Sequence, residues 1–204
     1  MKIRLFGLTL LFFILGTMVL STKTSFAAKE LYDNDAFWVC YGLGDLRIGD
    51  HAYYEDPSIS QYGYSWHTST ARLEWDKATA ADIDWYKVSN YDTASTRFFA
   101  GDYTWASYYG KMQAYKGNGD AVLDSELSIK HTVFYRTHVL INNYEMDKNN
   151  LSGTLRAETV THEVGHVLNM KHQDNAANSI MKKNDWLYSY TPTSVDYRNV
   201  NYKY

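Results

Sequence analysis

The sequence predicts a single α+β domain. Residues 65–81 and 152–168 carry helical patterns, whereas residues 83–88 and 131–142 are alternating or β-branched segments typical of strands. The chain of 204 residues is long enough for one domain with a substantial core, and it contains no internal repeat, low-complexity tract or second domain. Strands and helices are therefore expected to share one core.

The composition excludes several classes of protein. The net charge is −3, which leaves no basic excess of the kind that attracts nucleic acid, so no nucleic-acid partner is expected. The chain has a single cysteine and cannot form an internal disulfide. Tyrosine is unusually common, at 19 residues, and there are 6 tryptophans, so aromatic side chains are available for the core and for binding surfaces.

The first 28 residues have the composition of a secretory signal peptide. Two basic residues, Lys2 and Arg4, precede an apolar run over residues 5–20, and small residues favour cleavage near Ala27 or Ala28. The alternative is a membrane anchor, but the run is shorter than the roughly 20 residues that span a bilayer. We therefore expect a secreted, extracellular protein whose single domain begins at residue 29, without stable membrane association after cleavage.

The N-terminal half is expected to contain a strand, a helix and a second strand. Residues 46–54 alternate loosely as a first strand, which Asp56-Pro57-Ser58 should end. Residues 65–81 form a helical pattern, and residues 83–88 alternate as the next strand. The apolar residues of the helical pattern are Trp66, Leu73 and Trp75.

The middle of the chain is rich in aromatic and β-branched residues. Residues 96–109 are β-prone, and residues 111–116 have the length of a short strand. Gly117-Asn118-Gly119-Asp120 is a turn signal. Residues 131–142 then form the clearest strand segment of the sequence.

Two helices are expected in the C-terminal third. Ser152 is a suitable N-cap for a helix that ends near Leu168. Thr191 as N-cap and Pro192 at the first helical position open a final helix. Asp196 lies near its start, where an acid suits the helix dipole.

The first of these helices carries a group of metal-ligand residues. His162 and His166 are four residues apart and project from one helical face, with Glu163 beside the first of them. His172 follows six residues later, and a continuous helix would carry it about 9 Å beyond the site. The chain must therefore turn near Asn169, a residue type that tolerates the left-handed conformation. Three histidines at this spacing, with an intervening Glu, predict a zinc site.

This motif resembles the extended zinc signature of the metzincin metallopeptidases, with Asn169 where that family usually has Gly. Ser179-Ile180-Met181 follows at a suitable distance and resembles the Met-turn, although Met181 alone would be interpreted as core filler. The match is to a matrixin-like, bacterial secreted type, and it covers roughly residues 46–204. It implies a twisted, mostly parallel sheet with an antiparallel edge strand, an active-site helix, a Met-turn and a C-terminal helix.

The resemblance implies a secreted zinc-dependent endopeptidase. His162, His166 and His172 would hold one zinc ion, leaving a fourth position open, and a zinc-activated water would hydrolyse the peptide bond with Glu163 as general base. The substrate is expected to be a protein or peptide, and the enzyme a monomer. The alternative is a non-catalytic, zinc-stabilised binding module for peptide or cell-surface polymer. Such a module would have no need of Glu163, whose presence favours the enzyme.

By analogy with the family, substrate would lie along the edge strand of the sheet. Trp186, Leu187 and Tyr188 are candidates for lining the pocket beyond the cleaved bond, with core packing as the alternative. Some metzincins place a tyrosine ligand two residues after the Met-turn methionine, but position 183 here is Lys. The sequence does not determine the physiological substrate, the cleavage preference or the mechanism of latency.

Other residues with metal-binding chemistry are assigned less specific roles. Cys40 could mimic the zinc-bound propeptide cysteine of matrixins, but the surrounding pattern is absent and an idle buried thiol is favoured. Asp33 and Asp35 are interpreted as solvated acids. No acidic loop of EF-hand type occurs, so structural calcium would rest on the family alone. Four further histidines have no ligand spacing and are interpreted as structural or surface residues: His51, His67, His131 and His138.

Overall fold

The computed structural model describes residues 36–43, 49–176 and 178–204, and it has the α+β architecture expected from the sequence. The expected signal peptide, Asp33 and Asp35 lie outside the described residues. The strands are β1 (His51–Glu55), β2 (Trp85–Lys87), β3 (Thr96–Gly101), β4 (Gly110–Tyr115) and β5 (Arg136–Asn142). The helices are α1 (Pro57–Gln61), α2 (Ser65–Asp76), α3 (Asn143–Lys148), α4 (Gly153–Val167) and α5 (Ser194–Lys203), with short 3-10 turns at η3 (Tyr91–Thr93) and η4 (Asp124–Ser128).

The five strands form one mostly parallel sheet in the order β2-β1-β3-β5-β4. The central strands β1, β3 and β5 are parallel, and Phe98 of β3 pairs with Val139 of β5. Strand β4 is antiparallel to β5 and lies at the edge of the sheet. Its outer side is occupied in part, because Met112 N donates to the Glu163 carboxylate and the Ala114 carbonyl accepts from Val122 N. The sheet therefore has the mostly parallel arrangement and antiparallel edge that were expected.

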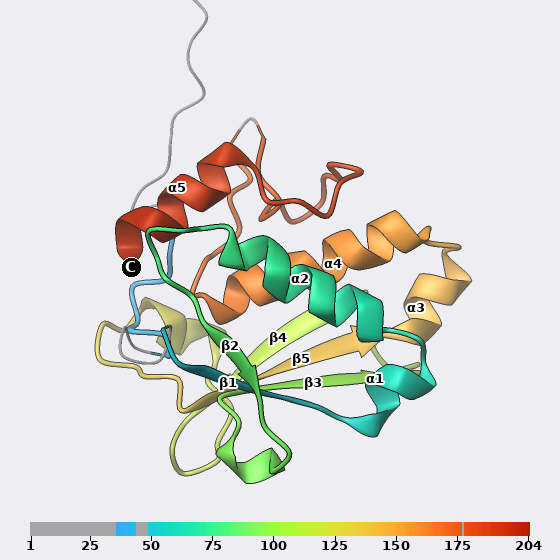
Figure 1. The fold of residues 1–204 in the computed structure, drawn as a ribbon, viewed down its shortest axis with the longest axis horizontal. Coiled ribbons are helices and arrows are strands. Elements are labelled where there is room, and N and C mark those ends of the chain that lie inside the picture. The colour runs from blue at the N-terminus through green and yellow to red at the C-terminus, as the bar shows by residue number, and fades with distance from the viewer. Residues whose placement is uncertain (1–35, 44–48, 177) are drawn as a thin grey trace, which may run out of the picture.

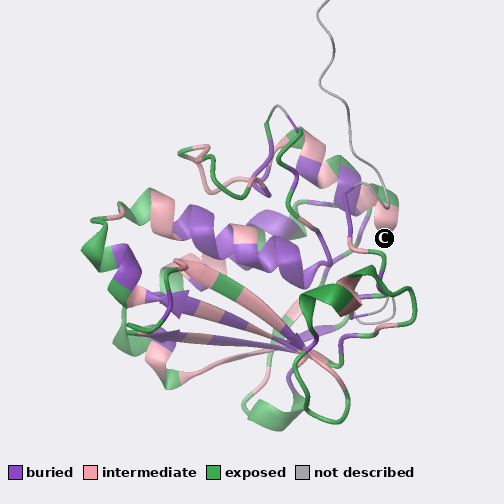
Figure 2. Ribbon diagram, turned by 180° about the vertical axis from the view of Figure 1, so that it is seen from behind, coloured by how far each residue is buried: buried purple, intermediate pink, exposed green. Residues whose placement is uncertain are grey.

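Helices α2 and α4 lie side by side over one face of the sheet (Figure 1). The buried side of α4, purple in Figure 2, presents Val160, Val164 and Val167, all fully buried, to the core. Trp75 of α2 is also fully buried, and its indole Nε1–H donates to the Thr161 carbonyl of α4 over 2.8 Å. This contact fixes the two helices relative to each other along the segment that carries the metal-ligand motif.

Two helical segments differ from the expectation. Asp56-Pro57-Ser58 does not simply break the chain, because Asp56 caps Ser58 N and Pro57 begins helix α1. The final helix begins at Ser194 rather than near Pro192. Thr193 is its N-cap, because the Asp196 carboxylate three residues later accepts from the Thr193 N–H and completes a capping box.

Other boundaries are narrower than predicted. Of the segment 46–54, strand β1 includes only the part from His51 onward, and residues 46–48 lie outside the described residues. Of the three apolar residues in this helical pattern, only Trp75 is buried, because Trp66 and Leu73 are 53% and 60% exposed. Helix α3 was not expected, because its six residues follow β5 without an intervening turn signal.

Within the part of the chain that the structure describes, no helix is both long enough and apolar enough to span a bilayer.

Candidate metal centre

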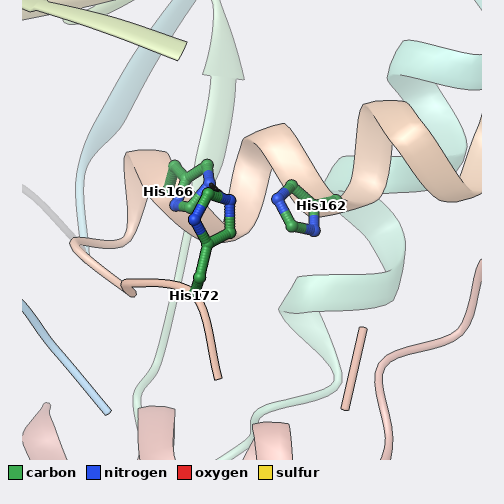
Figure 3. A group of neighbouring side chains, drawn as sticks. All are labelled: His162, His166 and His172. Carbon is green, nitrogen blue, oxygen red and sulfur yellow. Dashed lines mark hydrogen bonds between the residues drawn. The ribbon is translucent and has the colours of Figure 1, made fainter. Parts of the chain in front are cut away.

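Helix α4 carries the first two histidines and Glu163. Its N-terminus is set by Ser152, whose side chain accepts from Leu155 N, as the sequence predicted. Its end is set by Asn169, which has a φ of 65° and so turns the chain in the left-handed region. Figure 3 shows the result: His172 rises from the segment after the helix toward His166 on α4.

The three rings converge on one point. Their nearest ligand atoms lie within 4.8 Å of one another, and the Nε2 atoms of His166 and His172 are 3.3 Å apart. Tetrahedral coordination at about 2.1 Å places ligand nitrogens about 3.4 Å apart, so this pair already has a suitable separation. Among the described residues, this is the one group of three or more potential ligands, and it could hold a metal ion.

Two backbone carbonyls orient the rings. His162 Nδ1–H donates to the Ile180 carbonyl over 2.7 Å, and His166 Nδ1–H donates to the Met170 carbonyl over 2.6 Å. Each hydrogen bond assigns the proton to Nδ1 and leaves the Nε2 lone pair facing the other histidines. This is the tautomer that a metal ligand requires, so the donor set fits a divalent ion such as zinc.

Desolvation favours the neutral form of the three imidazoles, most strongly in His162 and His166, because His172 is partly exposed. Burial lowers the pKa of His162 to about 4 and that of His166 well below the usual value, and in His166 the neighbouring His162 and His172 lower it further. The pKa of His172 is also lowered, mainly by burial. Neutral imidazole is the form that coordinates a metal, so the site is ready for an ion without first releasing protons at neutral pH.

Glu163 lies beside the ligands and against the edge strand. Its Oε2 accepts from Met112 N of β4 over 2.6 Å. Burial raises the pKa of this carboxyl to about 7, against the opposing effects of the Met112 N–H and Lys111. A Cβ at Gly110 would lie 2.8 Å from Glu163 Cγ, so the strand can approach this closely only with glycine there. A carboxyl with a pKa near neutrality is suited to accept and release a proton.

Met181 is buried beneath α4, a position that both the Met-turn interpretation and ordinary core packing would give it. Its sulfur lies directly against Gly165, where a side chain would collide with it. The turn at residues 179–181 is held by Asp196, whose carboxylate accepts from Ser179 Oγ and from Ile180 N. Because the Ile180 carbonyl accepts from His162, this turn directly supports the first ligand.

The ligands and Glu163 line a cavity of about 540 Å³. Of the three pocket residues predicted from the sequence, Trp186 lines this cavity, Leu187 packs against the core and Tyr188 is 73% exposed. Tyr109, which was not predicted, forms a wall with Trp186 at a ring-centroid distance of 5.8 Å. Its position just before strand β4 becomes informative only once β4 is known to be the edge strand.

The loop before β4, residues 102–109, is held by the side-chain amide of Asn142, a residue that was not predicted from the sequence. Asn142, at the end of β5, is fully buried. Its Nδ2 lies within 3.2 Å of the carbonyls of Tyr103, Ala106 and Tyr108, and its Oδ1 accepts from Tyr103 N. The loop that forms one wall of the cavity is therefore fixed from inside the protein.

The remaining candidate ligands are elsewhere. The Cys40 thiol is buried and free, and it donates to Asn169 Oδ1 over 3.3 Å instead of pointing into the cluster. His51 of β1 is hydrogen-bonded to Thr96 of β3, and His131 is exposed. His67 and His138 are half-buried and also lie outside the described ligand group.

No family model and no curated protein matches this chain. Among solved structures, a chain of the GM1-bound form of the ECX AB5 holotoxin is similar to it, with 16% sequence identity and a TM-score of 0.46. The match covers 76% of this chain and 80% of that chain. A TM-score of this size is too low to establish a shared fold.

Proposed function

We propose that this chain is a secreted zinc-dependent endopeptidase of the metzincin type. The observation that carries the proposal is that three neutral imidazoles and Glu163 face one cavity, with both helix histidines in the Nδ1–H tautomer. The proposal includes residues 1–28 as a cleaved signal peptide, one zinc ion on His162, His166 and His172, and action as a monomer on protein or peptide.

A bound zinc ion would supply Lewis-acid chemistry, lowering the pKa of a coordinated water toward about 7 and polarising a carbonyl. The chain's own part is the movement of the proton. Glu163, which faces the same cavity as the three histidines, would accept the proton of the attacking water and deliver it to the leaving amine of the cleaved bond. Its hydrogen bond from Met112 N holds the carboxyl in place during both transfers.

The edge strand supports an extended polypeptide as substrate. Strand β4 runs along the cavity, and its residues from Gly110 to Ala114 line it. An extended chain can add to a strand edge through backbone hydrogen bonds, while side chains enter pockets on alternate sides. Here it would add to the part of the edge before Ala114, whose carbonyl already accepts from Val122 N. Tyr109 and Trp186 would contact one such side chain through their rings.

The test is the substitution Glu163→Gln in the mature protein. Gln keeps the shape of the side chain and its amide oxygen can still accept from Met112 N, but it is not a general base. We expect one zinc bound per chain in both proteins, measured by metal analysis. Peptidase activity on an unfolded protein should fall by about 10²-fold or more in the variant.

A chelator provides the second arm of the experiment. It should abolish cleavage by the parent protein, and zinc should restore it. If Glu163→Gln cleaves as fast as the parent, Glu163 is not the base. If the parent binds zinc but cleaves nothing from a peptide library, the chain is instead a zinc-stabilised binding module.

A further inference from the structure

The segment of residues 36–43, here called the N-terminal strap, pairs with the turn that follows α4. Trp38 N donates to the Asn169 carbonyl over 3.1 Å, and Lys171 N donates to the Ala36 carbonyl over 3.0 Å. These two bonds flank an antiparallel bridge between Phe37 and Met170. The strap, blue in Figure 1, is thus hydrogen-bonded to the residues on both sides of Met170, whose own carbonyl accepts from His166.

The Asn169 side chain adds a clamp to this pairing. Its Nδ2 donates to the Cys40 carbonyl over 2.9 Å and lies 3.3 Å from the Trp38 carbonyl. Its Oδ1 accepts from the Cys40 thiol. Asn169 is fully buried, and the strap approaches it so closely that a Cβ at Gly42 would lie 2.9 Å from its Cβ. A glycine at position 169 could turn the chain equally well but would provide none of these contacts.

Trp38 lies directly on the second candidate ligand. Its ring is stacked on the His166 imidazole, with centroids 5.1 Å apart and planes inclined by 23°. His166 is thereby held in two ways: the Trp38 ring restricts rotation of the imidazole, and the Met170 carbonyl fixes its Nδ1. Both restraints come from the strap or from residues paired with it.

We propose that Trp38 is a positioning residue for His166 and that the pairing of the N-terminal strap with the turn after α4 holds Trp38 in place. The inference rests on the proposed metal site, and it assigns to Asn169 the second role of clamping the strap. Groups that orient a metal ligand without touching the metal commonly contribute 10- to 100-fold to metal affinity. The strap would therefore be needed for tight metal binding, although none of its residues is a ligand.

The test measures zinc affinity by competition with a chromophoric chelator, using the mature secreted protein. Trp38→Ala should weaken zinc binding by about 10-fold or more, whereas Trp38→Phe should stay within about 3-fold because it keeps an aromatic ring over His166. Val39→Ala is the matched control, since Val39 lies in the same strap with 45% of its surface exposed. It should bind zinc as the parent does.

Asn169→Gly removes the side-chain hydrogen bonds to the strap while keeping the backbone conformation that ends α4. Glycine adopts the same positive φ, so the helix should end unchanged and the protein should fold, with zinc affinity between those of Trp38→Ala and the parent. If Trp38→Ala fails to fold, the zinc affinity of Asn169→Gly shows whether the strap contributes to metal binding. Equal zinc affinity in Val39→Ala and in the folded variants would overturn the inference alone. A parent that binds no zinc would overturn the proposed function and the inference with it.

Discussion

At the scale of single residues, Asp196 connects the start of helix α5 to the turn that contains Met181. Its carboxylate is fully buried and accepts from Ser179 Oγ, Ile180 N and both the N–H and hydroxyl of Thr193. Burial raises the pKa of the carboxyl, although these donors oppose the effect. The one side chain therefore caps α5 and shapes the turn that contains Met181.

Removal of this carboxylate should be strongly destabilising. Asp196→Ala leaves several buried donors without an acceptor, at a cost of about 1–3 kcal/mol for each group. We expect the free energy of unfolding, measured by urea titration, to fall by at least about 3 kcal/mol. Asp185→Ala is the control, because Asp185 is 70% exposed in a surface ion pair with Lys182 and should contribute less than about 1 kcal/mol. Equal losses in the two variants would contradict this account.

The convergence of the three histidines, with Glu163 beside them, could be predicted from the sequence. All four residues lie on one helix and the turn after it, so their spacing along the chain determines which of them meet. Trp38 and Asn142 could not be predicted in this way. Trp38 reaches His166 through pairing between segments more than a hundred residues apart in the sequence. Asn142 acts on a loop that precedes it by more than thirty residues. No spacing rule within one element connects such residues, because strand pairing brings them together.

At the scale of elements, α4 is tightly packed along the half that carries His162 and His166 and open at its start. A Cβ at Gly165 would meet the Met181 sulfur and would lie 2.8 Å from Trp75 Cζ2. A Cβ at Gly153 would meet nothing within 4 Å. The same substitution should therefore have opposite effects at the two ends of one helix.

Gly165→Ala should lower the free energy of unfolding by about 1–3 kcal/mol, because the extra methyl forces Met181 or Trp75 to move. Gly153→Ala should leave it unchanged or raise it by up to about 1 kcal/mol through helix propensity. Urea unfolding followed by circular dichroism measures both. A Gly165→Ala protein as stable as Gly153→Ala would show that the packing under the helix is looser than described.

The long helices were predicted better than the short elements. Helix α4 has an N-cap at Ser152, regularly spaced valines and an Asn at its end, and these signals agree. Helix α5 was predicted to begin after Thr191, but its N-cap is Thr193, because Thr193 forms a capping box with Asp196. Helices α1 and α3 are five and six residues long, too short for a helical period to be recognised.

At the scale of the whole molecule, His138 should make stability depend on pH. It packs between Phe99 and Tyr115, at ring-centroid distances of 5.1 and 4.4 Å. Burial, together with the nearby guanidinium groups of Arg97 and Arg136, lowers its pKa to about 4. The unfolded chain takes up a proton near pH 6.5, whereas the folded chain does so only near pH 4. The contribution of neutral His138 to the free energy of unfolding is therefore fully present above the pKa of the unfolded chain. It is lost as the pH falls toward the pKa of the folded chain.

His138→Gln should remove this part of the acid sensitivity. Between pH of about 6.5 and about 4, we expect the parent to lose about 1–2 kcal/mol more than the variant, a value reduced for the partial exposure of the ring. Urea titrations across that range, with a chelator present in all samples, measure the difference without interference from metal release. The exposed His131 gives a control, since His131→Gln should follow the parent. If the free energy of unfolding falls equally with pH in the parent and in His138→Gln, His138 is not the source of this acid sensitivity.

The buried Asn142 amide also has a kinetic consequence. A loop fixed by hydrogen bonds to the end of a central strand does not need to become ordered when a ligand arrives. The conformational entropy of residues 102–109 is then lost during folding rather than during association, so a ligand meets a wall that is already shaped. Association with a flexible polypeptide should consequently be limited by the ordering of that partner, not by closure of the protein around it.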